Sequence, residues 1–111
     1  MEQLTLHEKF GPNYVLLELE GSINAYTLFE LKEKLYQYIM DANVVLDLSL
    51  VSTIDMAGMG VIMAACNDGT DSGTKVFIMN PSEGAKTAIE KTGFEDTFYL
   101  IHAVTEVSDA S

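Results

Sequence analysis

A segment in the middle of the chain places an acidic side chain at the start of a predicted helix. Asp55 stands where an N-cap is expected, and Met59, Ile62, Met63 and Cys66 follow it at helical spacing. A helix N-terminus carries unpaired backbone N–H groups and partial positive charge, so it suits a phosphate or an acidic side chain. The segment therefore predicts a binding site at the point where a strand gives way to a helix.

The residue types that usually carry enzyme chemistry are poorly placed in this chain. Cys66 falls on the apolar stripe of the predicted helix, which favours a small core residue over a reactive thiol. His7 and His102 have no neighbouring serine or cysteine pattern, and we expect both at the surface or at a cap. The glycine pair in 58–60 has no lysine after it, so it is no phosphate-binding loop. One cysteine and two histidines allow no zinc set. We expect no enzyme, no cofactor and no metal site.

Two aspartates invite comparison with a phosphoacceptor receiver domain. Asp47 and Asp55 would supply part of its acidic pattern. A receiver domain also needs an acidic pair after its first strand, to hold magnesium, and a lysine after its fifth strand. Both are missing, so this interpretation is disfavoured.

Strands and helices alternate around the central segment. An early hairpin is predicted at Gly11-Pro12-Asn13, and Val44 to Leu48 is a short apolar run typical of a strand covered on both faces. Leu28, Leu31, Leu35 and Tyr38 are predicted to line one face of a helix. The expected strands are 3–10, 14–20, 44–48, 75–79 and 97–101. This order argues for a single α/β sandwich with a mixed sheet.

The later helix carries clear start and stop signals. Asn80 is predicted to cap it, Pro81 fits its first position, and Glu83 follows the cap by three residues, as in a capping box. Gly93 is predicted to end the helix, with Phe94 packing back over its last turn. A terminal helical turn is expected over 103–107. The domain is then 1–107, and 108–111 form a frayed tail.

The charge of the chain limits its partners. Seventeen acidic and six basic residues give a formal net charge of −11 over 111 residues. Such a chain repels the nucleic-acid backbone and is steered toward basic protein surfaces, although acidity also serves solubility. No apolar run approaches the roughly 20 residues that cross a bilayer, and the N-terminus lacks signal-peptide features. We expect a cytoplasmic protein with no nucleic-acid or membrane partner.

Four segments, in this order and spacing, resemble the STAS domain of bacterial anti-sigma factor antagonists, or anti-anti-sigma factors. They are residues 20–27, 44–65, 79–82 and 92–94. In that family the central segment reads roughly Asp-Leu-Ser, a few residues, then Ile-Asp-Ser-Ser-Gly-Leu-Gly. The resemblance covers nearly the whole chain and implies a single α/β STAS domain, with a mixed sheet of four to five strands packed with about four helices.

The resemblance implies binding to an anti-sigma factor that is also a serine kinase, which frees a sigma factor. The kinase phosphorylates the second serine of the pair and so breaks the complex, and a serine phosphatase acting on the phosphorylatable form is a further implied partner. Here the pair reads Met56-Ala57, so the phosphoacceptor position is Ala57 and has no hydroxyl. The residues implied for partner binding are Ser22, Ile23, Asn24, Thr53, Asp55, Met56, Ala57 and Gly58.

Asn24 is a second departure from the family pattern, after Ala57. Asn24 stands where the family usually has an aspartate that can pair with an arginine of the partner, which puts partner identity in doubt. Met56 is expected to be exposed and Met59 to lie in the core.

Three explanations of Ala57 stay open. In the first, Ala57 is an engineered replacement of a natural serine. In the second, the chain is a natural member that binds its partner constitutively. In the third, Ser49, Ser52 or Thr53 is phosphorylated instead. The alternative functions are a STAS module of another assembly, either transporter-associated or regulating a phosphatase pathway, and a small-ligand or nucleotide-binding module.

Overall fold

The chain folds into one sheet whose strands lie in the same order as in the sequence. The computed structural model describes residues 3–93 and 97–110. Within these ranges the elements are β1 (Leu4–Phe10), β2 (Tyr14–Ile23), α1 (Phe29–Ile39), β3 (Asn43–Ile54), α2 (Met56–Ser72), β4 (Val76–Met79), α3 (Glu83–Lys91), β5 (Tyr99–Ile101) and α4 (Thr105–Ala110). β1 and β2 form the predicted antiparallel hairpin, and the remaining neighbours pair in parallel. The predicted mixed α/β sheet is confirmed.

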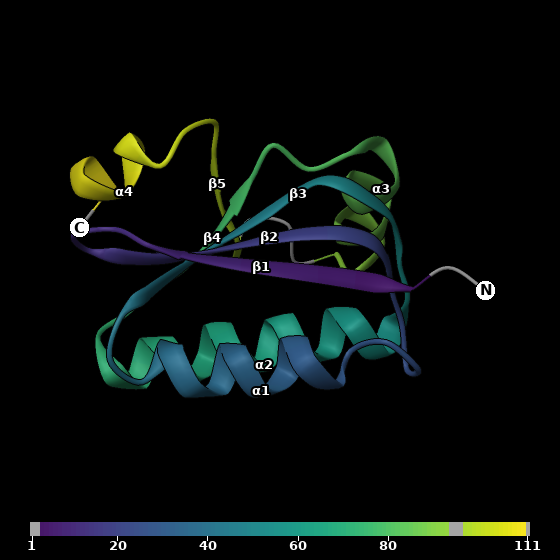
Figure 1. Ribbon diagram of the computed structural model, residues 1–111, viewed down its shortest axis with the longest axis horizontal. Coiled ribbons are helices and arrows are strands. Elements are labelled where there is room, and N and C mark those ends of the chain that lie inside the picture. The colour runs from purple at the N-terminus through teal and green to yellow at the C-terminus, as the bar shows by residue number, and fades with distance from the viewer. Residues whose placement is uncertain (1–2, 94–96, 111) are drawn as a thin grey trace.

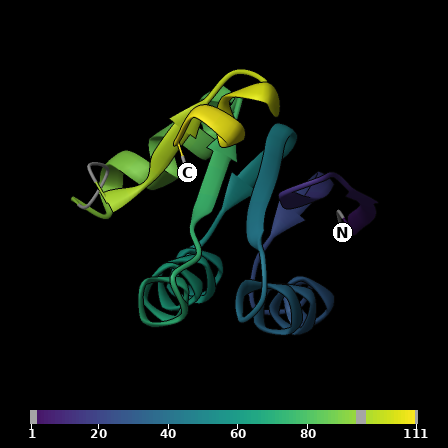
Figure 2. The same ribbon diagram turned by 90° about the vertical axis from the view of Figure 1, so that its left-hand side faces the viewer.

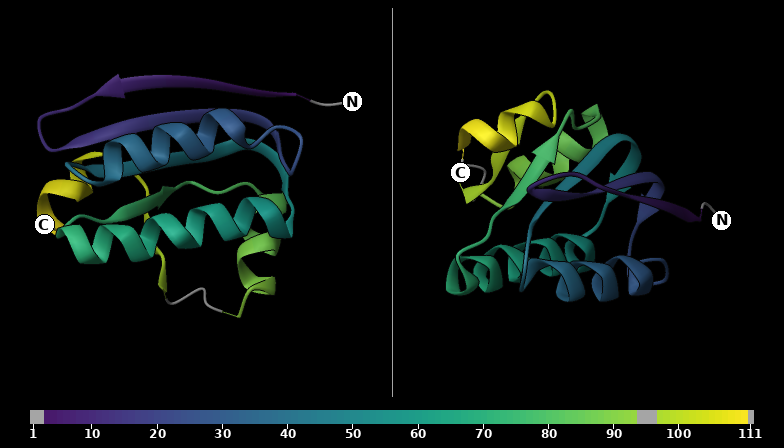
Figure 3. Two further views of the ribbon diagram at one scale, coloured as in Figure 1. Left: turned by 90° about the horizontal axis from the view of Figure 1, so that it is seen from below. Right: turned by 60° about the vertical axis from the view of Figure 1, so that its left-hand side comes forward.

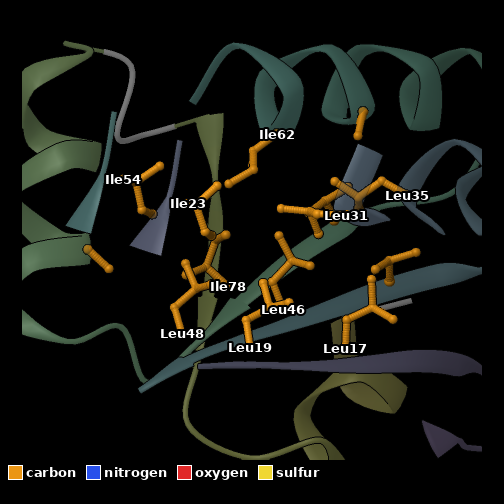
Figure 4. Packing of buried hydrophobic residues seen from close by; sticks show 14 of the residues in the cluster. Leu17, Leu19, Ile23, Leu31, Leu35, Leu46, Leu48, Ile54, Ile62 and Ile78 are labelled. Carbon is orange, nitrogen blue, oxygen red and sulfur yellow. The ribbon is translucent and has the colours of Figure 1, made fainter. Parts of the chain in front are cut away.

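The main core lies between the sheet and helices α1 and α2. Both helices run side by side along one face of the sheet (Figures 1 and 2). Leu17, Leu46 and Ile78 from neighbouring strands point toward Leu31 of α1 and Ile62 of α2, and all five are fully buried (Figure 4). The parallel strands are apolar on this face because helices cover it. This packing holds the starts of α1 and α2 in fixed positions.

A smaller core closes the opposite face of the sheet. Leu16, Val45, Phe77 and Ile101 are buried there together with Val107 of α4. Helix α4 continues to Ala110, so it includes three of the four residues that we assign to a frayed tail. None of the helices in the described parts of the chain combines the length and the apolar character needed to cross a membrane.

Strand β3 is longer than the sequence predicts. It continues past Leu48 to Ile54, whereas β4 pairs with it only as far as Asp47. Beyond that point β3 pairs with β2 alone, through Ile23 opposite Ile54. Ser49, Leu50, Ser52 and Thr53 in this extension are exposed, whereas Val51 and Ile54 are buried. The continuous apolar run of the sequence therefore ends at Leu48, although the strand does not. The extension carries Ser52 and Thr53 up to the start of α2.

The predicted cap of α3 is wrong by two residues. Ser82, not Asn80, is the N-cap, because its Oγ accepts a hydrogen bond from the N–H of Ala85 at 3.1 Å. Asn80 adopts a left-handed backbone conformation with φ 49°, and its Nδ2 donates to the carbonyl oxygen of His102 at 3.0 Å. Its side chain is thus used to hold the segment after β5. Glu83 becomes the first helical residue rather than the third residue after a cap.

The predicted end of α3 is confirmed. Gly93 has a φ of 73°, the left-handed conformation expected of the residue that stops a helix. The predicted packing of Phe94 lies outside the described residues. The last strand is shorter than expected, because it begins at Tyr99 rather than at Thr97.

Candidate functional site

Asp55 joins three segments at the end of the sheet where β2 and β3 stop. Its Oδ1 accepts a hydrogen bond from the N–H of Gly58 at 2.9 Å, which confirms the predicted cap of α2. Its Oδ2 accepts a bond from the N–H of Ala25 at 3.3 Å, in the loop between β2 and α1. Its own N–H donates to the carbonyl oxygen of Ile23 at 3.0 Å. One side chain therefore fixes the start of α2 against the loop that leads into α1.

The β2–α1 loop is shaped by its own polar side chains. Asn24 Oδ1 accepts bonds from the N–H groups of Tyr26 at 2.9 Å and Thr27 at 3.2 Å. Thr27 Oγ1 accepts from the N–H of Asn24 at 3.0 Å and donates to the carbonyl oxygen of Ser22 at 2.7 Å. An asparagine at this position thus stabilises the turn by itself, as asparagine does in many tight turns.

The eight residues implied for partner binding come together at this end, but they play different parts. Met56 is 78% exposed, and Thr53, Asp55 and Ala57 are also exposed. Ser22 is half-buried, and its Oγ lies 3.3 Å from Thr53 Oγ1. These residues have side chains that a partner can reach.

Ile23 and Gly58 support the site from beneath. Ile23 is fully buried, so its side chain cannot be a direct contact. Gly58 is buried as well, and a Cβ added to it would lie 2.7 Å from Cγ2 of Ile23. Because such a distance is sterically forbidden, the glycine lets the first turn of α2 lie directly on the end of β2.

The three hydroxyls that could replace a missing phosphoacceptor do not lie together. Ser52 Oγ lies 3.1 Å from Ser22 Oγ and donates to the carbonyl oxygen of Gly21 at 3.3 Å, so it belongs with Thr53 to the same cluster. Ser49 Oγ instead donates to Asp47 Oδ1 at 2.7 Å. Ser49 shares a small hollow with Glu18 and Glu20, away from the start of α2. A phosphate on Ser49 would be repelled by these carboxylates.

The candidate catalytic groups lie away from this site. Cys66 is half-buried beside the main core, and burial raises the pKa of its thiol to about 11. It is therefore a weak nucleophile at neutral pH. His7 and His102 are exposed, as predicted. Among residues 3–93 and 97–110, no three His, Cys, Asp or Glu side chains are grouped so that they could hold a metal ion.

Two exposed aromatic residues lie next to the site, and the sequence pattern alone does not assign them to it. Tyr26 in the β2–α1 loop is 84% exposed, and Phe29 at the first position of α1 is 70% exposed. The helical pattern contains a signal for Phe29, because it lies off the stripe formed by Leu31 and Leu35. A position off the buried stripe predicts that the side chain of Phe29 is exposed, but not that it belongs to a contact surface.

The architecture is shared with solved structures. An anti-sigma factor antagonist from Mycobacterium paratuberculosis superposes with a TM-score of 0.81, at 19% identity, over 96% of this chain and 92% of that chain. SpoIIAA of Bacillus, solved in unphosphorylated and phosphorylated forms, superposes in the former with a TM-score of 0.76 at 14% identity, over 94% and 92% of the chains. SLC26A9 superposes with a TM-score of 0.65 at 16% identity, over 84% of this chain but 19% of that chain.

These superpositions establish a common fold. The sequence itself carries the family assignment, because the family model of the STAS domain matches residues 6–110. That match includes the Asp55 cap, the exposed start of α2 and every strand of the sheet except the first two residues of β1. The chain belongs to the STAS domain family.

Proposed function

We propose that this protein is an anti-sigma factor antagonist that binds an anti-sigma factor with serine kinase activity and so frees a sigma factor. The observation that carries the proposal is the exposed Ala57 at the second position of α2, next to the Asp55 cap. This is the position of the phosphorylated serine in the family motif. The likeness to an anti-sigma factor antagonist and to SpoIIAA supports the same function.

The chemistry of the position determines how the partner is controlled. A phosphate adds about −1.5 to −2 charges and a bulky group, and it disrupts a close interface by desolvation and repulsion. Ala57 offers a methyl group that no kinase can modify. The complex with the kinase is therefore insensitive to ATP at this position, and a serine phosphatase has no substrate there. The protein acts as a permanently active antagonist.

Direct binding tests the proposal. Each anti-sigma kinase encoded in the genome that carries this gene is titrated with the purified protein by calorimetry. Met56→Lys adds a charge to the exposed start of α2 and is expected to weaken binding by about 2–4 kcal/mol, the range of a central contact. Circular dichroism should be unchanged because Met56 is exposed. If Met56→Lys binds as tightly as the wild type, the partner uses another face.

A second candidate is supported by the likeness to SLC26A9. The chain covers 19% of that protein, which means that its fold also occurs as one part of a much larger chain. In this alternative the domain is a module of a transporter-associated assembly. Co-purification of a transporter component with the tagged protein from its native cell, and no binding to any anti-sigma kinase, would favour it.

A nucleotide-binding role can be distinguished by a thermal-shift measurement. Two hollows of about 430 Å³ and 450 Å³ share Gly73 and Thr74, at the end of the sheet opposite Asp55. A ligand that binds only the folded state raises the unfolding temperature in proportion to the logarithm of its concentration. An unchanged melting temperature at millimolar ATP or GTP would exclude this role.

A further inference from the structure

We propose that the partner is held mainly by an apolar anchor formed by Tyr26, Phe29 and Met56, rather than by a charged contact. This inference rests on the proposed function and identifies the chemistry of the partner surface. The three side chains are 84%, 70% and 78% exposed. Single exposed apolar side chains are common on protein surfaces, but several of them gathered at one end of a molecule mark an interaction surface.

The three residues lie on adjoining segments at one end of the molecule. Phe29 and Met56 are the first residues of α1 and α2, and both helices start at the end where β2 and β3 stop (Figures 1 and 3). Tyr26 lies in the loop before α1. The N–H of its neighbour Ala25 donates to Asp55, which directly precedes Met56. Ala57 follows Met56, so the anchor borders the phosphoacceptor position.

The polar groups of this end are already engaged within the chain. Both carboxylate oxygens of Asp55 accept backbone hydrogen bonds, from Gly58 and Ala25. Asn24 Oδ1 accepts two backbone bonds in its own loop. A partner that drew either side chain out of this arrangement would break bonds that hold the local backbone. The side chains of Tyr26, Phe29 and Met56 are mostly exposed and belong to neither hydrophobic core, so a partner can cover them without disturbing the fold.

The acidity of the chain indicates which kind of partner binds this apolar anchor. The formal net charge is −11, and Asp55 and the exposed Glu30 flank the anchor. A second copy of the chain and an anionic membrane would both be repelled. The surface fits a protein partner that presents an apolar pocket with basic residues around its rim. Interfaces of this kind place aromatic and methionine side chains at the centre and charges at the rim.

The chain offers matched controls at its other end. Phe10 is 67% exposed at the end of β1, and Met40 is 58% exposed just after α1. Both lie where β2 and β3 begin, because Phe10 is paired with Val15 and Met40 precedes Asn43. Phe10→Ala therefore serves as the control for Phe29→Ala, and Met40→Ala as the control for Met56→Ala.

The test measures the affinity of each variant for the purified anti-sigma kinases by calorimetry. Tyr26→Ala, Phe29→Ala and Met56→Ala should each raise Kd at least about tenfold, as anchor residues do. Phe10→Ala and Met40→Ala should leave Kd within about twofold. The association rate of the wild type should fall as salt is raised, because a basic rim attracts the acidic chain. Melting temperatures confirm that every variant is folded.

Three other results would contradict the inference, and they differ in whether the proposed function also fails. If the wild type binds a kinase and the three variants bind equally well, the anchor is wrong while the proposed function stands. If the wild type binds none of the kinases, both fall. If the variants instead abolish a dimer seen by sedimentation, or abolish binding to phosphatidylcholine–phosphatidylglycerol vesicles, the surface belongs to a second copy or a membrane, and the inferred partner is wrong.

Discussion

A Cβ atom added to Gly84 would lie 1.8 Å from the carbonyl oxygen of Ser52. The first turn of α3 thus rests on the backbone of β3 just before the strand reaches Asp55. The contact is reinforced by Ser82, whose N–H donates to the carbonyl oxygen of Leu48 at 3.1 Å and whose Oγ donates to that of Val51. Helix α3 therefore packs against the part of β3 that lies beyond its pairing with β4.

Gly84→Ala should destabilise the protein. The new methyl group overlaps backbone atoms that cannot rotate away, so we expect the free energy of unfolding in urea to fall by about 2–3 kcal/mol. Gly60→Ala is the control, because a Cβ at Gly60 meets nothing within 4 Å. Alanine should stabilise that helical position by about 0.5–1 kcal/mol. Equal effects of the two substitutions would contradict the close contact of α3 with β3.

Asp55→Ala should remove the cap of α2. The loss of an aspartate N-cap costs about 1 kcal/mol of folding stability, measured as a shift of the urea midpoint. Asp55→Asn keeps an oxygen that can accept from Gly58, so its stability should stay within about 0.5 kcal/mol of the wild type. A loss as large for Asp55→Asn as for Asp55→Ala would show that the charge, and not the cap, is what stabilises this end.

Ala57→Ser should restore the phosphorylation switch. With its kinase partner and ATP, intact mass spectrometry should show one added phosphate on Ala57→Ser, and the complex should dissociate. The unaltered protein should stay unmodified and bound. Ala57→Asp should bind more weakly without loss of stability, because a carboxylate in the first turn of a helix favours the fold. A phosphate on Ser52 or Thr53 of the unaltered chain, with release of the partner, would mean that the switch has moved.

Cys66 should react slowly with thiol reagents. At pH 8 a thiol of pKa about 11 is ionised to roughly one part in a thousand, against about one in ten for the ordinary value of 9.0. Unfolding in urea should therefore accelerate the reaction greatly. The pKa of Cys66 is higher in the folded state than in the unfolded chain, so raising the pH from 9 toward 11 ionises the thiol of the unfolded chain first. The free energy of unfolding should therefore be unaffected by this thiol below pH 9 and should fall as the pH rises toward 11. Cys66→Ala should lack this part of the alkaline loss of stability.

The purified protein should not hydrolyse ATP or GTP. Turnover in a mixture with a kinase should belong to the kinase and disappear when the kinase is inactivated. Steady hydrolysis by the isolated protein, abolished by Asp55→Ala at a temperature where that variant is folded, would show a catalytic role that we do not expect.

The sequence predicts which of Met56 and Met59 is buried, the cap of α2 and the order of the elements, because each follows from local hydrophobic spacing. Met59 was expected in the core and is 2% exposed, whereas Met56 was expected to be exposed and is. Asp55 is expected to cap α2 because it directly precedes a helical apolar stripe, and one of its carboxylate oxygens does so. The bond that its other oxygen accepts from Ala25 could not be predicted, because it depends on how the two loops meet. The order of strands and helices followed from alternating apolar periods.

The features that could not be predicted depend on tertiary contacts. Asn80 has the residue type of a cap, but the packing of the segment after β5 draws its side chain to His102 instead. The sequence underestimates the length of β3 because its last residues pair with a single strand and alternate irregularly between exposed polar residues and buried apolar ones. The exposed position of Tyr26 follows from a loop conformation that Asn24 sets locally and that no periodicity records.

The strands lie in the sheet in the order in which the chain is synthesised. From β1 to β5, each new strand joins the outer edge of the sheet that already exists, so no strand has to insert between two formed neighbours. The β1–β2 hairpin closes only a short loop, so its pairing costs little entropy and provides the first sheet edge. After β3 has joined, and until β4 arrives, Val44, Val45 and Leu46 form an unpaired apolar edge. A pause in synthesis at that stage would leave this edge open to pairing with another chain, which is a route to aggregation.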